Sequence, residues 1–267
     1  MIIHIVTSDF TLKAKSKRYV VSFKEKEYEF PAIKTECIIL NPHGNLTSAA
    51  VKLAEEHKTT IIFVDDNFKI TYLSFLDAAK DIKYLLGQVE SFLHRKEEYA
   101  KIFSKTAENS RKQIVKYLDL GFESEGDFWR DEEKYIQRLE EVFGSKIRYM
   151  VNFARARLVA ECLHFLLKTG LHPSLGFLHE GEASLAKDLA LELQYNVCDL
   201  TAVNVVKKGG TIKNLVQMYQ KKMETSFTHP VLKRQTTYRE AIKIQAKTLA
   251  ATMVSPDIKY SPLRTRL

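Results

Sequence analysis

An imidazole and two carboxylates lie close together in this sequence, at His179, Asp188 and Glu192. Asp188 and Glu192 are spaced i and i+4 in a segment with helical periodicity, so they are predicted to share one helix face. His179 lies nine residues before Asp188, and a short loop can bring it back beside the first turn of that helix. Carboxylates with one imidazole suit Mg²⁺ or Mn²⁺, and Mn²⁺ tolerates the nitrogen ligand better. Such an ion activates oxygen nucleophiles and neutralises the charge that develops on phosphoryl oxygens.

The chain that must position these residues begins with a segment of a different kind, residues 1–78. Its short runs are rich in Val, Ile, Tyr, Phe and Thr and are separated by polar turns, which is typical of β-strands. One helix is predicted from Thr47 or Ser48 to about His57, because a hydroxyl can cap its start. The predicted strands are Met1–Thr7, Arg18–Phe23, Glu27–Phe30, Glu36–Leu40, Thr59–Val64 and Lys69–Leu73.

Residues 79–267 follow a helical pattern, with apolar residues at helical spacing from Leu85 onward. A polar patch at residues 121–126 interrupts the pattern, and Pro256 stops the last helix. The predicted helices include Asp131–Arg148, Val151–Lys168, Ser184–Gln194, about Thr211–Glu224, and Thr237–Met253. The sequence therefore predicts an α+β protein, in which a small N-terminal β-sheet domain (1–78) precedes a larger all-α helical domain (79–267) that carries the site.

Positive charge is concentrated at the end of the chain. The formal net charge is +8, but residues 207–267 hold 13 Lys and Arg against 3 Asp and Glu, so the whole excess lies there. Concentrated positive charge attracts polyphosphate partners, although a basic face with no partner is the alternative. The residues predicted to contact the phosphates of such a partner are Lys207, Lys208, Lys221, Lys222, Lys233, Arg234 and Arg239.

The three cysteines, Cys37, Cys162 and Cys198, are far apart and form no CxxC pair. This pattern argues against a disulfide framework or a zinc ribbon and favours small buried side chains in a reducing compartment. The first residues alternate like a strand rather than forming a signal peptide, and no apolar run approaches the ~20 residues of a membrane span. We therefore expect a cytoplasmic protein.

The segment Gly170–Glu180 (GLHPSLGFLHE) runs into Ser184–Leu189 (SLAKDL). This stretch resembles the signature of the CRISPR-associated spacer integrases, the family of CRISPR-associated protein one: a Gly-Leu-x-Pro turn, a Gly-Phe-Leu-His-Glu turn and a helix that opens Ser-Leu-Ala-x-Asp-Leu. Three further stretches are similar to that family: Leu46–Ala50 with Thr60–Asp65, Glu141–Ile147, and Tyr238–Ile242 with Gln245–Ala250 and Tyr260–Arg264. Together the four stretches touch most of the chain.

The resemblance implies a metal-dependent DNA endonuclease and integrase, which inserts spacer DNA into CRISPR arrays by attack of a 3′-hydroxyl on a phosphodiester. The family's metal-binding glutamate falls on Glu141, its histidine on His179 and its helical carboxylate on Asp188. These are the expected catalytic residues, and with Glu192 they are the expected ligands of Mg²⁺ or Mn²⁺. The resemblance also implies a homodimer joined through the β domains. Two such homodimers would flank a dimer of CRISPR-associated protein two and bind double-stranded or branched DNA with free 3′ ends.

Two departures from the family pattern suggest an alternative. The family has a second carboxylate three residues after the aspartate, where this chain has Leu191. The segment from Glu141 to Val151 is also shorter than in the family. A catalytically weakened member that acts as a DNA-binding scaffold in the adaptation complex is therefore the second hypothesis. A basic helical module for RNA is a third.

Overall fold

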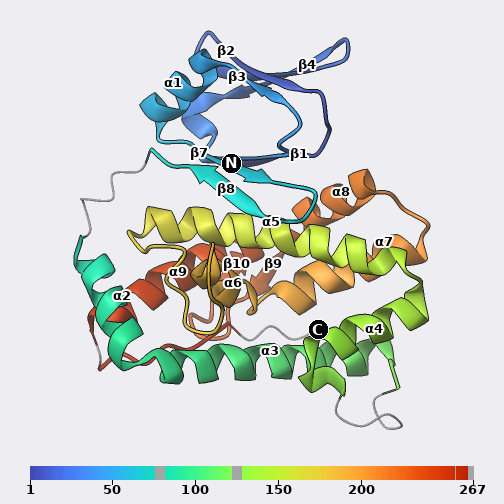
Figure 1. Cartoon of the computed structure of the whole chain (residues 1–267), viewed down its shortest axis with the longest axis vertical. Helices are drawn as coiled ribbons and strands as arrows, with labels where there is room; N and C mark the ends of the chain where they lie inside the picture. The colour runs from blue at the N-terminus through green and yellow to red at the C-terminus, as the bar shows by residue number, and fades with distance from the viewer. Residues whose placement is uncertain (76–81, 122–127, 256, 264–267) are drawn as a thin grey trace. The chain divides into compact units, whose positions relative to one another are not determined.

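The computed structural model describes residues 1–75, 82–121, 128–255 and 257–263 (Figure 1). The chain divides into two compact units, Met1–Lys80 and Asp81–Leu267. The predicted boundary between residues 78 and 79 and nearly all of the polar patch at 121–126 lie outside the described residues. Each unit is described by itself below.

The N-terminal unit contains a mixed sheet with the strand order β1-β5-β7-β8. Strands β1 (Ile2–Ile5), β5 (Cys37–Leu40) and β7 (Thr60–Val64) are parallel, and β8 (Ile70–Leu73) pairs antiparallel with β7. All four residues of β5 are buried, which fits a central strand covered on both faces.

A second sheet in this unit has the order β4-β3-β2-β6. Its strands are β4 (Lys26–Pro31), β3 (Arg18–Phe23), β2 (Thr11–Lys15) and β6 (Asn45–Leu46). Helix α1 (Ser48–His57) begins where predicted, because the Thr47 side chain accepts a hydrogen bond from the backbone N–H of Ala50. Strand β2 was not predicted, although its lysines alternate with less exposed residues as in a half-buried strand.

The C-terminal unit is mostly helical and is built around α5 (Lys146–Lys168), whose side chains are buried along most of its length. The other helices are α2 (Ile82–His94), α3 (Lys96–Leu118), α4 (Glu132–Phe143), α6 (Ser184–Ala190), α7 (Leu200–Lys207), α8 (Ile212–Met223) and α9 (Tyr238–Val254). Helix α5 contacts α4 and every helix from α6 to α9. This unit also contains an antiparallel pair of short strands, β9 (Ser226–Thr228) and β10 (Gln235–Thr237). The prediction of an all-α domain did not include this pair, although the unit is mostly helical.

The predicted helix Ser184–Gln194 is shorter than expected. Helix α6 ends at Ala190, and the next backbone bonds run from each N–H to the carbonyl three residues earlier, such as Leu191 to Asp188. A π-helical segment, Gln194–Asp199, follows. No glycine or proline marks this change, so no helix-breaking residue indicates it.

The cysteines Cys37, Cys162 and Cys198 are buried and free, as predicted. Among the described residues, no helix combines the length and apolarity that crossing a bilayer requires.

Candidate functional site

Asp188 of α6 organises the turn that carries His179. Its carboxylate is fully buried and accepts backbone N–H bonds from Phe177 (2.6 Å), Leu178 (3.1 Å) and His179 (3.0 Å). The same carboxylate lies 2.6 Å from the Nδ1 atom of His179. Both carboxylate oxygens are therefore engaged by the turn, and Asp188 orients His179 rather than presenting an open oxygen to a ligand.

Glycine is required where this turn meets the start of α6. The backbone N–H of Gly176 donates to the hydroxyl of Ser184 at 2.9 Å. A Cβ atom on Gly176 would lie 2.6 Å from the carbonyl carbon of Ser184, closer than such atoms approach. The family-like glycine and serine thus allow the close packing that brings His179 back beside Asp188, as the sequence predicted.

The contact with Asp188 also sets how His179 can react. Asp188 is the acceptor, so the neutral imidazole carries its proton on Nδ1 and leaves Nε2 as a lone-pair acceptor. The His179 side chain is 39% exposed and lines a cavity of about 330 Å³ in the helical unit. A buried carboxylate that fixes the ring in this way is common behind metal-binding and proton-accepting histidines.

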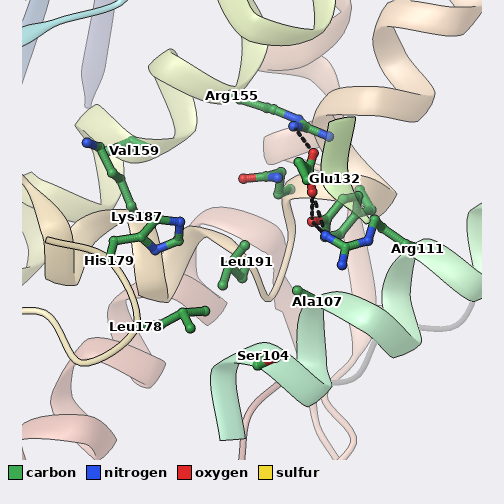
Figure 2. A pocket seen from close by; sticks show the side chains of 12 residues that line it. Ser104, Ala107, Arg111, Glu132, Arg155, Val159, Leu178, His179, Lys187 and Leu191 are labelled. Carbon is green, nitrogen blue, oxygen red and sulfur yellow. Dashed lines mark hydrogen bonds and ion pairs between the residues drawn. The ribbon is translucent and has the colours of Figure 1, made fainter. Parts of the chain in front are cut away.

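The cavity is formed by α3, α4, α5, the His179 turn and the segment from α6 onward (Figure 2). Among the described residues, its lining consists of Ser104, Ala107, Arg111, Glu132, Arg155, Val159, Leu178, His179, Lys187, Leu191, Gln194 and Tyr195. Figure 2 shows Arg111, Arg155 and Glu132 on one side, His179 on the other and Leu191 between them.

Glu132, at the start of α4, is held by two cations and a phenol. Arg111 and Arg155 each donate to its carboxylate at 2.5 Å, and the Tyr195 hydroxyl donates to it at 2.7 Å. Burial disfavours its ionised form, but the charge of Arg155, the Tyr195 hydrogen bond and the charge of Arg111 outweigh burial and lower the pKa of Glu132. Glu132 is therefore an ionised carboxylate whose charge is already balanced by protein groups.

A second carboxylate, that of Asp199, holds Arg155 in place. Asp199 is fully buried and receives two hydrogen bonds from Arg155, at 2.7 and 2.6 Å, and one from the Tyr135 hydroxyl at 2.9 Å. Burial raises the pKa of Asp199 although the charge of Arg155 opposes this. The planar guanidinium of Arg155 thus bridges Asp199 and Glu132 in one fixed orientation.

Glu192, predicted to lie on the same face as Asp188, faces a different environment. It accepts hydrogen bonds from the Gln245 amide (2.8 Å), the Leu263 backbone N–H (2.8 Å) and the Tyr260 hydroxyl. The cause is the tightened turn after Ala190, because with three residues per turn it is position i+3, not i+4, that lies above Asp188. Leu191 consequently lines the cavity, and Glu192 holds the C-terminal tail.

Glu141 also lies apart from His179. It is exposed near the end of α4 and pairs with Arg138 at 2.8 Å. It follows Glu132 by nine residues, about two and a half helical turns, so the two glutamates face opposite sides of α4. The structure therefore brings together His179 and Asp188 but not the predicted set of four.

A divalent ion needs several open oxygen ligands. Among the described residues, Glu132 is the one carboxylate that lines the cavity, and it is bound by Arg111, Arg155 and Tyr195. The described part of the chain contains no group of three or more His, Cys, Asp and Glu side chains that could hold a metal. These residues do not fit the predicted Mg²⁺ or Mn²⁺ site.

The basic residues predicted to contact DNA differ in how accessible they are. Five are exposed: Lys207, Lys208, Lys221, Lys233 and Arg234. Lys222 lies over the ring of Tyr238 at 5.0 Å, and burial lowers its pKa. Arg239 donates to the buried Glu161 at 2.8 Å and also pairs with Glu224, so it is an internal structural cation.

Several residues of the cavity carry no signal in the sequence. Arg111, Glu132, Arg155 and Lys187 lie on four different helices, and an ion pair between distant helices leaves no local spacing pattern. Only the tertiary fold brings these charges together.

Comparison with protein families gives one assignment for most of the chain. The family described as CRISPR associated protein Cas1 matches residues 3–146 and 144–237. The chain is 23% identical over 209 residues to the CRISPR-associated endonuclease Cas1 of Clostridium perfringens, covering 64% of this chain and 63% of that protein. It is 29% identical over 143 residues to a Cas1 endonuclease of Moorella thermoacetica, covering 45% of this chain and 42% of that protein. The matched region thus spans less than two thirds of these relatives.

Solved structures show the same fold. A casposase bound to integration product superposes with a TM-score of 0.76 at 17% identity, covering 98% of this chain and 92% of that chain. A Cas1 protein from Thermotoga maritima superposes with a TM-score of 0.68 at 16% identity, covering 96% and 97%. The β-rich N-terminal region followed by a mostly helical region is the architecture of these structures.

Proposed function

Since this chain belongs to the Cas1 family, whose curated members are named CRISPR-associated endonucleases, we propose that it acts in CRISPR adaptation as a DNA-binding scaffold with no divalent ion beside His179. One observation carries the proposal: the carboxylate that faces His179 across the cavity, Glu132, is neutralised by Arg111 and Arg155. A carboxylate already paired with two guanidinium groups is a poor ligand, because a metal ion would have to displace both cations.

Leu191 supports the same conclusion. It lies where the family has its second helical carboxylate, and the tightened turn directs this position into the cavity. An aliphatic side chain offers no electron pair to a cation. Asp188 does not replace it, since its oxygens accept three backbone bonds and the bond from His179.

The proposed partners are DNA, a second copy of the chain and Cas2. Structural neighbours include one described as a Cas1–DNA complex (TM-score 0.58) and one described as a Cas6-RT-Cas1–Cas2 complex (TM-score 0.72). The exposed basic residues between Lys207 and Arg234 are suited to DNA phosphates, which position a duplex without reading its sequence. The dimer would join through the N-terminal units, as the family resemblance implies.

Strand transfer tests the proposal. The full chain is mixed with Cas2, a short duplex bearing free 3′-hydroxyls and a supercoiled plasmid, with Mn²⁺ or with chelator. We expect the duplex to bind in both conditions and to be neither joined nor cleaved in either. Metal-dependent joining by the unmodified chain that His179→Ala abolishes would overturn the scaffold assignment.

Leu191→Asp is the matched gain-of-function variant. It places a carboxylate on the cavity wall at the family position, so we expect calorimetry to detect Mn²⁺ binding that the unmodified chain lacks. Leu178→Asp is the control, since it adds a carboxylate to the same cavity from the His179 turn. Equal Mn²⁺ binding by the unmodified chain and by Leu191→Asp would contradict the proposed role of Leu191.

A second candidate function is metal-dependent joining of DNA ends with Mg²⁺ or Mn²⁺. It is favoured by one observation, the buried Asp188 that contacts Nδ1 of His179, whose side chain lines the cavity. A carboxylate behind a histidine is the usual outer support of a metal ligand. The strand-transfer assay decides between the two functions, because only this one requires the ion.

A further inference from the structure

The cavity beside His179 has an excess of positive charge. Among the described residues that line it, Arg111, Arg155 and Lys187 are basic and Glu132 is the one carboxylate. Asp199 does not line the cavity and has no exposed surface, and Arg155, which donates two hydrogen bonds to it, balances its negative charge. Glu132 and Asp199 together balance the two arginines, so the net positive charge that a ligand entering the cavity would meet is that of Lys187.

The two arginines are held in place before any ligand arrives. Arg155 is fixed by its two bonds to Asp199, and Arg111 donates to the Tyr195 hydroxyl at 2.7 Å and to the Arg130 carbonyl at 3.0 Å. Both guanidinium groups also lie over the Tyr195 ring, at 5.4 and 5.2 Å from its centroid. Fixed guanidinium groups bind oxyanions well, since little side-chain entropy is lost when the contact forms.

Lys187 lies on the His179 side of the cavity, opposite the arginines (Figure 2). It is exposed on α6, and no ion pair engages it within the described chain. An exposed ammonium group at the edge of a cavity can move to meet an anion. Nε2 of His179 is nearby as a further polar atom, so the cavity offers fixed cations on one side and an adaptable one on the other.

The size and walls of the cavity restrict what it can take. Its volume of about 330 Å³ is at the lower end of ligand pockets, which hold about 300–1,000 Å³. Ala107, Val159, Leu178 and Leu191 give it apolar walls between the two charged sides. A phosphate with its sugar matches this combination better than a bare inorganic anion, because the sugar can cover the apolar surface.

We propose that this cavity binds a phosphate group of a DNA strand directly, with Arg111, Arg155 and Lys187 supplying the positive charge that a divalent ion would otherwise supply. The inference rests on the proposed function, since it names the DNA group held by the scaffold. Phosphate groups are well matched by the planar guanidinium fork. The arginine pair is thus a built-in replacement for metal charge, not merely a consequence of its loss.

Glu132 distinguishes this site from a metal site. In a metal site Glu132 would be a ligand, and Glu132→Gln would weaken binding of any DNA that depends on the ion. In a phosphate site the negative charge of Glu132 repels the ligand and partly cancels the positive charge of both arginines. Glu132→Gln therefore strengthens metal-free binding. The same substitution therefore has opposite effects under the two arrangements.

The experiment measures fluorescence anisotropy of a labelled single strand with a 3′-phosphate, using the full chain in EDTA over a range of salt concentrations. We expect Lys187→Ala to weaken binding about three- to tenfold and to lower the slope of log affinity against log salt by about 0.7. Glu132→Gln should tighten binding about three- to tenfold. Lys134→Ala is the matched control, since Lys134 is exposed on α4 and does not line the cavity.

The outcomes separate this inference from the proposed function. Unchanged affinity and salt slope in Lys187→Ala and Glu132→Gln, with DNA still bound in EDTA, would overturn the phosphate site and leave the scaffold intact. Binding that requires Mn²⁺ and is lost in Glu132→Gln would overturn the site in favour of a metal ion. No binding of DNA under any condition would overturn both proposals. Lys187→Ala keeps the test decisive if Glu132→Gln fails to fold, because Lys187 is exposed.

Discussion

Asp188 and Glu192 are two buried carboxylates four residues apart that serve different parts of the helical unit. Asp188 has no exposed surface and Glu192 is 2% exposed. Asp188 accepts bonds from the backbone of the His179 turn and from the His179 ring. Glu192 accepts bonds from Gln245 of α9 and from the tail residues Tyr260 and Leu263. One carboxylate shapes the cavity, and the other attaches the end of the described chain to the core.

The difference arises from a local change in helix winding after Ala190. Had α6 continued as an α-helix, Glu192 would have lain about 40° from Asp188 around the helix, on the same face. Winding at three residues per turn moves it about 120° away and puts Leu191 on the cavity wall instead. The chain therefore uses its second carboxylate for structure, and the cavity obtains its charge from arginines.

The largest effect is expected from Asp188→Ala. Removing the carboxylate leaves the N–H groups of Phe177, Leu178 and His179 without their acceptor in a partly buried turn. We expect the free energy of unfolding to fall by about 3–5 kcal/mol. Urea titration followed by far-ultraviolet circular dichroism measures this loss. Asp188→Asn, which keeps one carbonyl oxygen, should lose clearly less, and equal stability of all three chains would show that the carboxylate does not support the turn.

The next effect concerns Glu192 and depends on pH. Burial raises the pKa of Glu192 to about 7, although Tyr260, Leu263 and Gln245 donate to it and act in the opposite direction. Between the ordinary pKa near 4.5 and 7, the native chain keeps this proton and the unfolded chain releases it. The stability contributed by the group is therefore complete below pH 4.5 and is lost as pH rises through 7, by about 3 kcal/mol in total.

Glu192→Gln isolates this effect, since the amide cannot ionise. We expect the stability of Glu192→Gln relative to the unmodified chain to increase by about 3 kcal/mol between pH 4.5 and pH 7.5. Urea titrations of both chains at several pH values measure this difference, and pH effects from other groups cancel in it. A difference that stays constant over this range would mean that the native pKa of Glu192 is not raised.

Much of the fold followed from the sequence, because its signals are local. The hydroxyl cap at Thr47, the strand composition of the first unit and the periodicity of α9 each depend on neighbouring residues. The His179 turn was predictable for the same reason, since its glycines and its aspartate lie within one short segment. The predicted β domain followed by a helical domain is the architecture observed.

The composition of the site was less predictable, because it depends on helix phase and on tertiary pairing. The assumption of an α-helix through Glu192 failed where backbone bonds tightened after Ala190. Glu132 escaped notice because its partners, Arg111 and Arg155, lie on other helices. An ion pair of this kind depends on how helices pack, and a single sequence carries no local pattern for it.

The smallest expected effect is that of Glu141→Gln, and it contrasts with Glu132→Gln on the same helix. Glu141 and Arg138 form an exposed i,i+3 pair, and such pairs contribute about 0–1 kcal/mol. We expect the free energy of unfolding to change by less than about 0.5 kcal/mol. DNA affinity in EDTA should stay unchanged, because Glu141 does not line the cavity. Glu132→Gln should alter DNA affinity under the same conditions. If Glu141→Gln instead abolished a Mn²⁺-dependent activity, the family-based assignment of Glu141 as a metal ligand would be supported, and the charge of the arginine cluster would no longer explain how the cavity works.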